Sequence, residues 1–151
     1  MRHWKSLLVF LLLAFAAGGV GSLAMPDAWY AALGKPSFNP PNGVFAPVWT
    51  ALFVLMAVAA WRVYRHAGFG AAIALWLAQL VFNAAWSPLF FGLHRIGLAL
   101  ADIVVLLALI LATSIAFFRI DRTAAALLLP YLAWVAFATA LTLAIFRLNP
   151  E

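Results

Sequence analysis

The side chains best placed for chemistry are a few polar residues inside long apolar runs. Gln79 and Asn83 lie four positions apart, so a helix would put both carboxamides on one face, and Trp86 and Phe90 continue that face. Asp102 is the one acid well inside an apolar run. Polar groups in hydrocarbon need partners, which are either other helices or a ligand. For Asp102, a functional carboxyl and a hydrogen-bonded packing group are both open interpretations.

Residue types needed for ordinary enzyme catalysis are sparse. His3, His66 and His94 fall at the ends of apolar runs, so no histidine base lies beside a nucleophile inside one. The chain has no cysteine, which excludes thiolate metal sites and a thiol nucleophile. No carboxylate pair, HExxH-type metal motif or glycine-rich phosphate loop occurs. We therefore expect no metal site and no required cofactor. Seven tryptophans leave photochemistry or radical chemistry on a bound pigment as one enzymatic alternative.

The composition indicates a membrane protein. Of 151 residues, 68% are hydrophobic and 9% are charged. About 20 apolar residues in a helix cross the ~30 Å hydrocarbon core of a bilayer, and long runs without alternation favour helices over barrel strands. We predict an all-α membrane protein, a single five-transmembrane-helix bundle over residues 1–151. The expected spans are about 5–25, 44–66, 69–92, 96–118 and 123–146, and residues 26–43 form the first loop.

The positive charges lie at the ends of the runs. This distribution indicates contact with lipid head groups, whereas nucleic-acid binding would need a clustered patch. The N-terminus and the second and fourth loops carry six Lys and Arg residues, and the opposite side carries three. By the positive-inside rule, we predict a cytoplasmic N-terminus, with the 26–43 loop on the other face.

The first run has an alternative interpretation as a cleaved signal peptide. It begins with basic residues and reaches Ser22-Leu23-Ala24, which resembles a cleavage site. Cleavage would leave four spans. We favour a retained span, because the run continues to Met25 and its glycines have a use in close helix packing.

The composition of the 26–43 loop predicts a rigid lid over one end of the helix bundle. It contains Pro36, Pro40 and Pro41 together with the aromatic residues Trp29 and Tyr30. Alternating chain direction places several aromatic, polar and small residues in the membrane half nearest this loop, namely Gly18, Trp49, Phe53, Asn83, Trp86, Asp102, Ala138 and Leu141. Aromatic walls with a few polar groups are typical of a pocket for a flat, largely apolar molecule. The alternative is that these side chains simply fill the bundle core.

A ridge of small residues, Gly70, Ala74 and Ala78, follows one face of the third span. Such ridges allow close helix approach, so this one predicts either a homodimer contact or packing within the chain.

Five segments resemble the translocator proteins, also called tryptophan-rich sensory proteins or peripheral-type benzodiazepine receptors. They are WYAALGKPSFNPP (29–41), PVWTALFVLM (47–56), QLVFNAAWSPLFF (79–91), ALADI (99–103) and PYLAWVAFATAL (130–141). The resemblance to a bacterial-type member covers nearly the whole chain. It implies a five-helix fold, usually a homodimer, with a ligand pocket under the first loop. It also implies binding of protoporphyrin IX, haem-related tetrapyrroles and isoquinoline or benzodiazepine drugs. The implied role is a membrane receptor or transporter-like protein in tetrapyrrole or stress signalling.

By motif position, the resemblance implies that Trp49 and Trp134 are paired pocket tryptophans. They would also be the reactive residues if the protein degraded porphyrin in light, which is one alternative function. A structural assembly partner in the membrane is another. The further ligand-binding residues implied are Ser22, Tyr30, Phe38, Pro41, Phe53, Asn83, Trp86, Ala138 and Leu141.

Three positions depart from the family pattern. Phe38 stands where the family typically has Trp, which removes an indole N–H donor. Gly43 replaces a common aromatic, so the loop is expected to grip less firmly, and Thr142 replaces a frequent Asn. The C-terminal cholesterol consensus needs a Tyr that is absent before Arg147. A sterol ligand is therefore disfavoured and a porphyrin is preferred.

Overall fold

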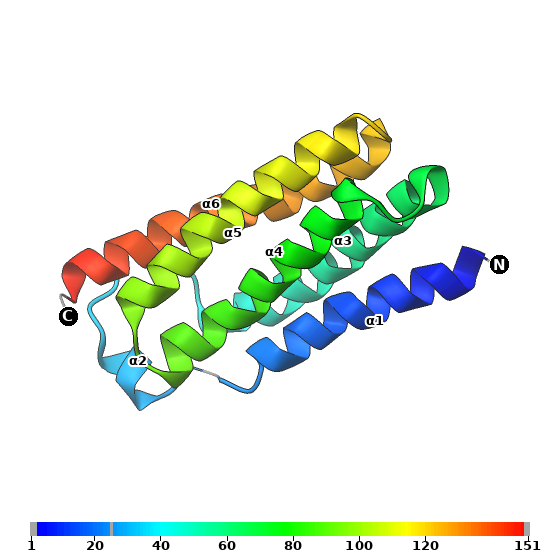
Figure 1. Cartoon of the computed structure of the whole chain (residues 1–151). Helices are drawn as coiled ribbons and strands as arrows, with labels where there is room; N and C mark the ends of the chain where they lie inside the picture. The colour runs from blue at the N-terminus through cyan, green and yellow to red at the C-terminus, as the bar shows by residue number, and fades with distance from the viewer. Residues whose placement is uncertain (1–2, 25, 150–151) are drawn as a thin grey trace.

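The computed structural model describes residues 3–24 and 26–149 as a bundle of five long helices (Figure 1). These are α1 (His3–Gly21), α3 (Phe45–Ala67), α4 (Ala71–Ser87), α5 (Ile96–Phe118) and α6 (Arg122–Leu148). Three short elements join them: α2 (Ala28–Ala32), the 3₁₀ turn η1 (Asn42–Val44) and the π-helical turn η2 (Pro88–Gly92). Within the described residues, five helices, with α4 and η2 counted together, are long and apolar enough to cross a membrane. The predicted all-α, multi-pass membrane fold is confirmed.

The long helices run alternately up and down, so the loops gather at two ends of the bundle (Figure 1). The N-terminal end holds the start of α1 and the α3–α4 and α5–α6 turns. The opposite end holds α2, the α4–α5 connection and the end of α6. This confirms the alternation expected from the sequence. The assignment of the N-terminal end to the cytoplasm stays a prediction.

Proline at position 88 does not break the third span. Its ring lacks an N–H, so it cannot donate to the carbonyl four residues earlier. The chain continues as the π-helical turn η2, in which the Leu93 N–H donates to the Pro88 carbonyl at 2.8 Å. The predicted 69–92 span is therefore one α-helical segment followed by a π-helical turn.

Small residues set the close approach of α1 to α3. A Cβ atom built on Gly18 would lie 2.7 Å from the Phe53 ring, whereas one built on Gly19 would meet nothing within 4 Å. Phe10, Ala14 and Ala17 of α1 are buried in the same core as Phe53. The glycine at position 18 is therefore used for helix packing.

Two contacts fasten the N-terminal end. The Trp61 indole N–H donates to the His3 carbonyl at 2.8 Å, joining α3 to α1. The Arg62 Nε donates to Asp121 Oδ2 at 2.7 Å, joining α3 to the start of α6. Asp121 also caps α6 by accepting from the Thr123 N–H at 3.0 Å. The Arg62 hydrogen bond, followed by the Thr123 N–H, lowers the pKa of the Asp121 carboxyl.

Candidate ligand site under the lid

The lid, residues 26–43, contains a short helix that the sequence did not predict. The Asp27 Oδ1 accepts from the Tyr30 backbone N–H at 3.1 Å and so caps α2. That hydrogen bond, helped by His94, lowers the pKa of the Asp27 carboxyl. The helix turns Tyr30 inward, where its side chain is buried. The Tyr30 hydroxyl donates to Asn39 Oδ1 at 3.4 Å, which links the two halves of the lid.

The lid is fastened at two further points. The Trp29 ring stacks on His94 of the α4–α5 connection at 4.1 Å, and His94 Nε2 lies 3.2 Å from Asp27 Oδ2. At the other side, the Gly34 N–H donates to Asn149 Oδ1 at 2.9 Å. Asn149 Nδ2 donates back to the Gly34 carbonyl at 2.7 Å. The lid therefore bridges the α4–α5 connection and the end of α6.

Tyr30 of α2 packs against a group of three rings of α4 and η2, and together these form the lid-side cluster, made of Tyr30, Trp86, Phe90 and Phe91. The edge of Tyr30 contacts Phe90 and Phe91 at centroid distances of 6.0 and 5.2 Å. Trp86 stacks on Phe90 at 4.9 Å and an angle of 21°. The Trp86 Nε1 atom is buried and has no hydrogen-bond partner among the described residues. A buried indole donor is therefore available to an acceptor.

Trp49 and Trp134, which the resemblance pairs in one pocket, each contact different aromatic rings. Trp49 on α3 lies 5.5 Å from Phe53, the ring that packs on Gly18. Trp134 on α6 lies 5.7 Å from Phe137, which in turn lies 6.0 Å from Phe38 of the lid. Trp134 is thus connected to the lid through one intervening ring.

The two carboxamides of α4 share one partner. Asn83 Nδ2 donates to the Tyr131 hydroxyl at 2.7 Å, and the Tyr131 hydroxyl donates to Gln79 Oε1 at 2.6 Å. The sequence left open whether another helix or a ligand satisfies these amides, and the structure shows Tyr131 of α6. Gln79 Nε2 and Asp102 Oδ2 stay buried and without a partner among the described residues.

The remaining predicted ligand residues lie at different depths. Leu141 is buried and Ala138 is partly buried, both on α6. Ser22 is exposed at the end of α1, and its hydroxyl donates to the Gly19 carbonyl at 2.8 Å. Pro41 is exposed and, together with Tyr30, lines a hollow of about 420 Å³ on the lid. The site residues thus run from the surface of the lid to the middle of the bundle, and their ligand roles stay predictions.

The ridge predicted for dimerisation faces outward from α4. Gly70 and Ala74 are exposed, and Ala78 is partly exposed. A Cβ atom on Gly70 would meet nothing within 4 Å. Packing within the described part of the chain leaves this ridge accessible, so the homodimer contact stays a prediction.

Sequence reasoning gave no role to Tyr131, Phe137 or Asn149. A hydroxyl in an apolar run was the available indication for Tyr131, because two buried carboxamides need a polar partner. Nothing local marked Asn149, since its bonds to Gly34 join residues 115 positions apart. Such contacts depend on the fold of the whole chain.

Comparison with known proteins decides the family, because the TspO/MBR family matches residues 7–148. The chain belongs to the TspO/MBR family. This membership confirms the resemblance drawn from the sequence motifs. It places the lid, the lid-side cluster and the two tryptophans in a family whose members include tryptophan-rich sensory proteins and translocator proteins.

Relatives of this TspO/MBR protein come from bacteria and animals. It is 44% identical over 146 residues to a tryptophan-rich sensory protein of Cereibacter sphaeroides, covering 97% of this chain and 92% of the relative. It is 39% identical over 150 residues to the tryptophan-rich protein TspO of Chlorobaculum tepidum, covering 96% and 95%. The similarity to the translocator protein of Homo sapiens is 39% identity over 126 residues, covering 80% and 75%.

Proposed function

We propose that this protein binds porphyrins, such as protoporphyrin IX, between the lid and the aromatic side chains beneath it. The proposed role is that of a membrane receptor or transporter-like protein in tetrapyrrole or stress signalling. Family membership supports this ligand class, since the motif resemblance implies tetrapyrrole binding. Flat aromatic walls suit a planar macrocycle, because stacked rings are stabilised by dispersion and quadrupole contacts. Drug-like isoquinoline and benzodiazepine ligands would compete for the same place.

The observation that supports the proposal most directly is the buried Trp86 Nε1 in the lid-side cluster, which has no hydrogen-bond partner among the described residues. A buried donor without an acceptor costs free energy, about 1–3 kcal/mol. A ligand with a carboxylate or carbonyl at its edge would supply the acceptor. Trp86 already stacks on Phe90, so its ring plane and its N–H direction are fixed before a ligand arrives. Such preorganisation lowers the entropy lost on binding.

The test is a titration of protoporphyrin IX into detergent-solubilised protein, followed by quenching of tryptophan fluorescence. We expect saturable binding that is about two- to tenfold weaker in Trp86→Phe, because that change removes the N–H and keeps an aromatic ring. Trp134→Phe should also weaken binding. Trp61→Phe is the matched control, since its indole already donates to His3 at the other end of the bundle.

Two results would overturn the porphyrin proposal. One is quenching that never saturates in the wild type. The other is equal affinity in Trp86→Phe, Trp134→Phe and Trp61→Phe. A competition arm with an isoquinoline carboxamide drug checks whether both ligand classes share the place, and full displacement is the expected result.

Light-dependent porphyrin breakdown is a second candidate, favoured by one contact. The Trp49 ring lies 6.2 Å from Tyr131, whose hydroxyl is hydrogen-bonded to both carboxamides of α4. A tryptophan beside a hydrogen-bonded tyrosine is suited to radical chemistry in the presence of light and oxygen. Under illumination, the wild type should then form a porphyrin breakdown product, and the Trp49→Phe/Trp134→Phe double variant should not. Equal bleaching by the double variant would leave only photochemistry of the pigment itself.

A further inference from the structure

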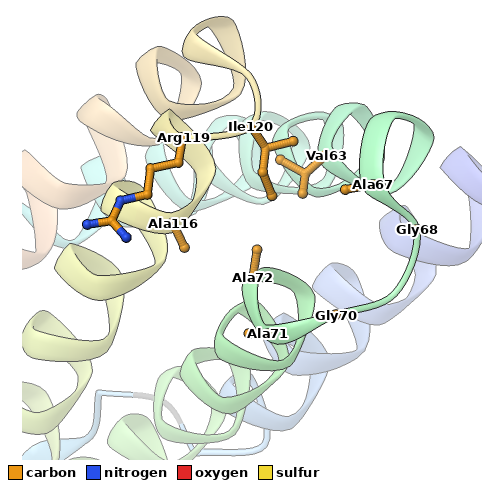
Figure 2. A pocket seen from close by; sticks show the side chains of 9 residues that line it. All are labelled: Val63, Ala67, Gly68, Gly70, Ala71, Ala72, Ala116, Arg119 and Ile120. Atoms are coloured by element: carbon orange, nitrogen blue, oxygen red, sulfur yellow. The ribbon is translucent and has the colours of Figure 1, made fainter.

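A second hollow opens at the opposite end of the bundle, far from the lid. It has a volume of about 320 Å³ and lies between the α3–α4 turn and the end of α5 (Figure 2). Val63, Ile120 and Ala72 point toward one another across it (Figure 2). Arg119 lies at its rim, and its side chain points away from these three residues (Figure 2). We call this the basic-end groove. None of its lining residues belongs to the lid site.

Small residues create the groove. Ala67, Gly68, Gly70, Ala71 and Ala72 follow one another closely around the α3–α4 turn, and Phe69 between them is 69% exposed and not among the lining residues. Cβ atoms on Gly68 or Gly70 would meet nothing within 4 Å. The walls are therefore hydrocarbon and recessed, and the exposed Arg119 stands at one edge with its side chain turned outward.

The charges around the groove are unbalanced. This end of the bundle carries the described cations Lys5, Arg62, Arg65, Arg119 and Arg122, and Asp121 is its one described acid. Asp121 is already bonded to Arg62. Arg65 lies over the Trp61 ring at 4.7 Å and Arg122 over the Phe118 ring at 5.4 Å. Arg119 has no carboxylate partner among the described residues.

We propose that the basic-end groove holds one anionic phospholipid, with an acyl chain in the groove and its phosphate at Arg119. Charge complementarity selects the head group, because basic residues at a membrane surface attract anionic lipids. The apolar walls favour a lipid over a soluble phosphate, since only a lipid also brings hydrocarbon to fill the hollow. Arg119 is exposed, so its long side chain is free to turn from the direction seen in Figure 2 toward a phosphate at the mouth of the groove. The groove is thus a lipid site separate from the porphyrin site.

The test uses the full chain in nanodiscs with equal amounts of phosphatidylglycerol and phosphatidylcholine that carry the same acyl chains. Native mass spectrometry then counts the lipids that stay on the released protein. We expect one retained phosphatidylglycerol, preferred about fivefold over phosphatidylcholine. Arg119→Gln should abolish the preference, and Arg119→Lys should keep most of it. Arg122→Gln, an exposed arginine at the same end that does not line the groove, should leave it unchanged.

Filling the groove separates the hydrocarbon contribution from the charge. Ala116→Phe and Ala71→Leu both place bulk in the hollow, and Ala71 is exposed, so at least that variant should fold normally by circular dichroism. Either folded variant should lose the retained lipid, whereas glycerol phosphate should not displace it from the wild type. An equal preference for phosphatidylglycerol in Arg119→Gln and Arg122→Gln would overturn the proposal. Retention of the lipid by a folded variant with a filled groove would also overturn it. Displacement by glycerol phosphate would reassign the site to a soluble phosphate.

Discussion

Tyr131 joins two polar side chains inside the bundle, because its hydroxyl bonds both carboxamides of α4. Tyr131→Phe keeps the ring but leaves the Asn83 donor and the Gln79 acceptor unpaired. We expect a loss of about 1–2 kcal/mol in the free energy of unfolding, measured in detergent against SDS. Tyr64→Phe is the matched control, since Tyr64 lies at the surface. Equal stability of the two variants would contradict the role given to Tyr131.

For these residues the sequence predicted that the two carboxamides of α4 need a hydrogen-bond partner, but it did not identify Tyr131 as that partner. The spacing of Gln79, Asn83, Trp86 and Phe90 correctly placed them on one face, as their contacts show. It left the partner of the amides undecided. The reason is physical: periodicity fixes which residues share a face of one helix, whereas the facing helix depends on how all five pack.

Helix packing makes opposite predictions for two adjacent glycines of α1. Gly18→Ala would set a Cβ 2.7 Å from the buried Phe53 ring, so we expect destabilisation of about 1–3 kcal/mol. Gly19→Ala meets nothing within 4 Å and should stabilise the helix by up to about 1 kcal/mol. Thermal unfolding in detergent by circular dichroism distinguishes them. Shifts of the same sign would contradict the packing described between α1 and α3.

The elements themselves were largely predictable, and the exceptions have identifiable causes. The fourth span was predicted at 96–118 and is Ile96–Phe118, because an uninterrupted apolar run leaves little choice of ends. The first helix ends at Gly21, earlier than predicted, where the glycines weaken it. The short helix α2 was missed because prolines dominate the lid, although Asp27 before an Ala-Trp-Tyr run was a capping indication.

The whole bundle should respond to pH through the contact between Arg62 and Asp121. Because the folded-state pKa of Asp121 is lowered, its stabilisation is complete above the unfolded-state value near 4 and is lost as the pH falls through the lower folded value. Asp121→Asn keeps a helix cap and removes the charge. At pH 7 we expect the variant to melt about 1–3 °C lower.

The same melting experiment at acid pH checks the sign. The difference between wild type and Asp121→Asn should shrink toward zero as the pH approaches 2. A difference that is absent at pH 7, or that persists undiminished at pH 2, would show that the Arg62 contact does not stabilise the folded bundle.

On the scale of the whole molecule, chain direction allowed the sequence to place the lid over the correct end of the bundle. It could not reveal the fastenings of the lid, since the bonds between Gly34 and Asn149 join distant parts of the chain. These fastenings suggest how the lid can be held shut. A Cβ atom on Gly34 would lie 3.6 Å from the Leu148 Cβ, within the 3.5–4.5 Å typical of a disulfide.

The central claim, that porphyrin enters beneath the lid, is tested most directly by locking the lid. The chain has no cysteine, so Gly34→Cys/Leu148→Cys introduces a single pair. Stopped-flow quenching by protoporphyrin IX should be at least about tenfold slower for the oxidised than for the reduced form, as expected when binding waits for an opening step. The reduced form should match the wild type. Equal rates for the oxidised and reduced forms would contradict the account.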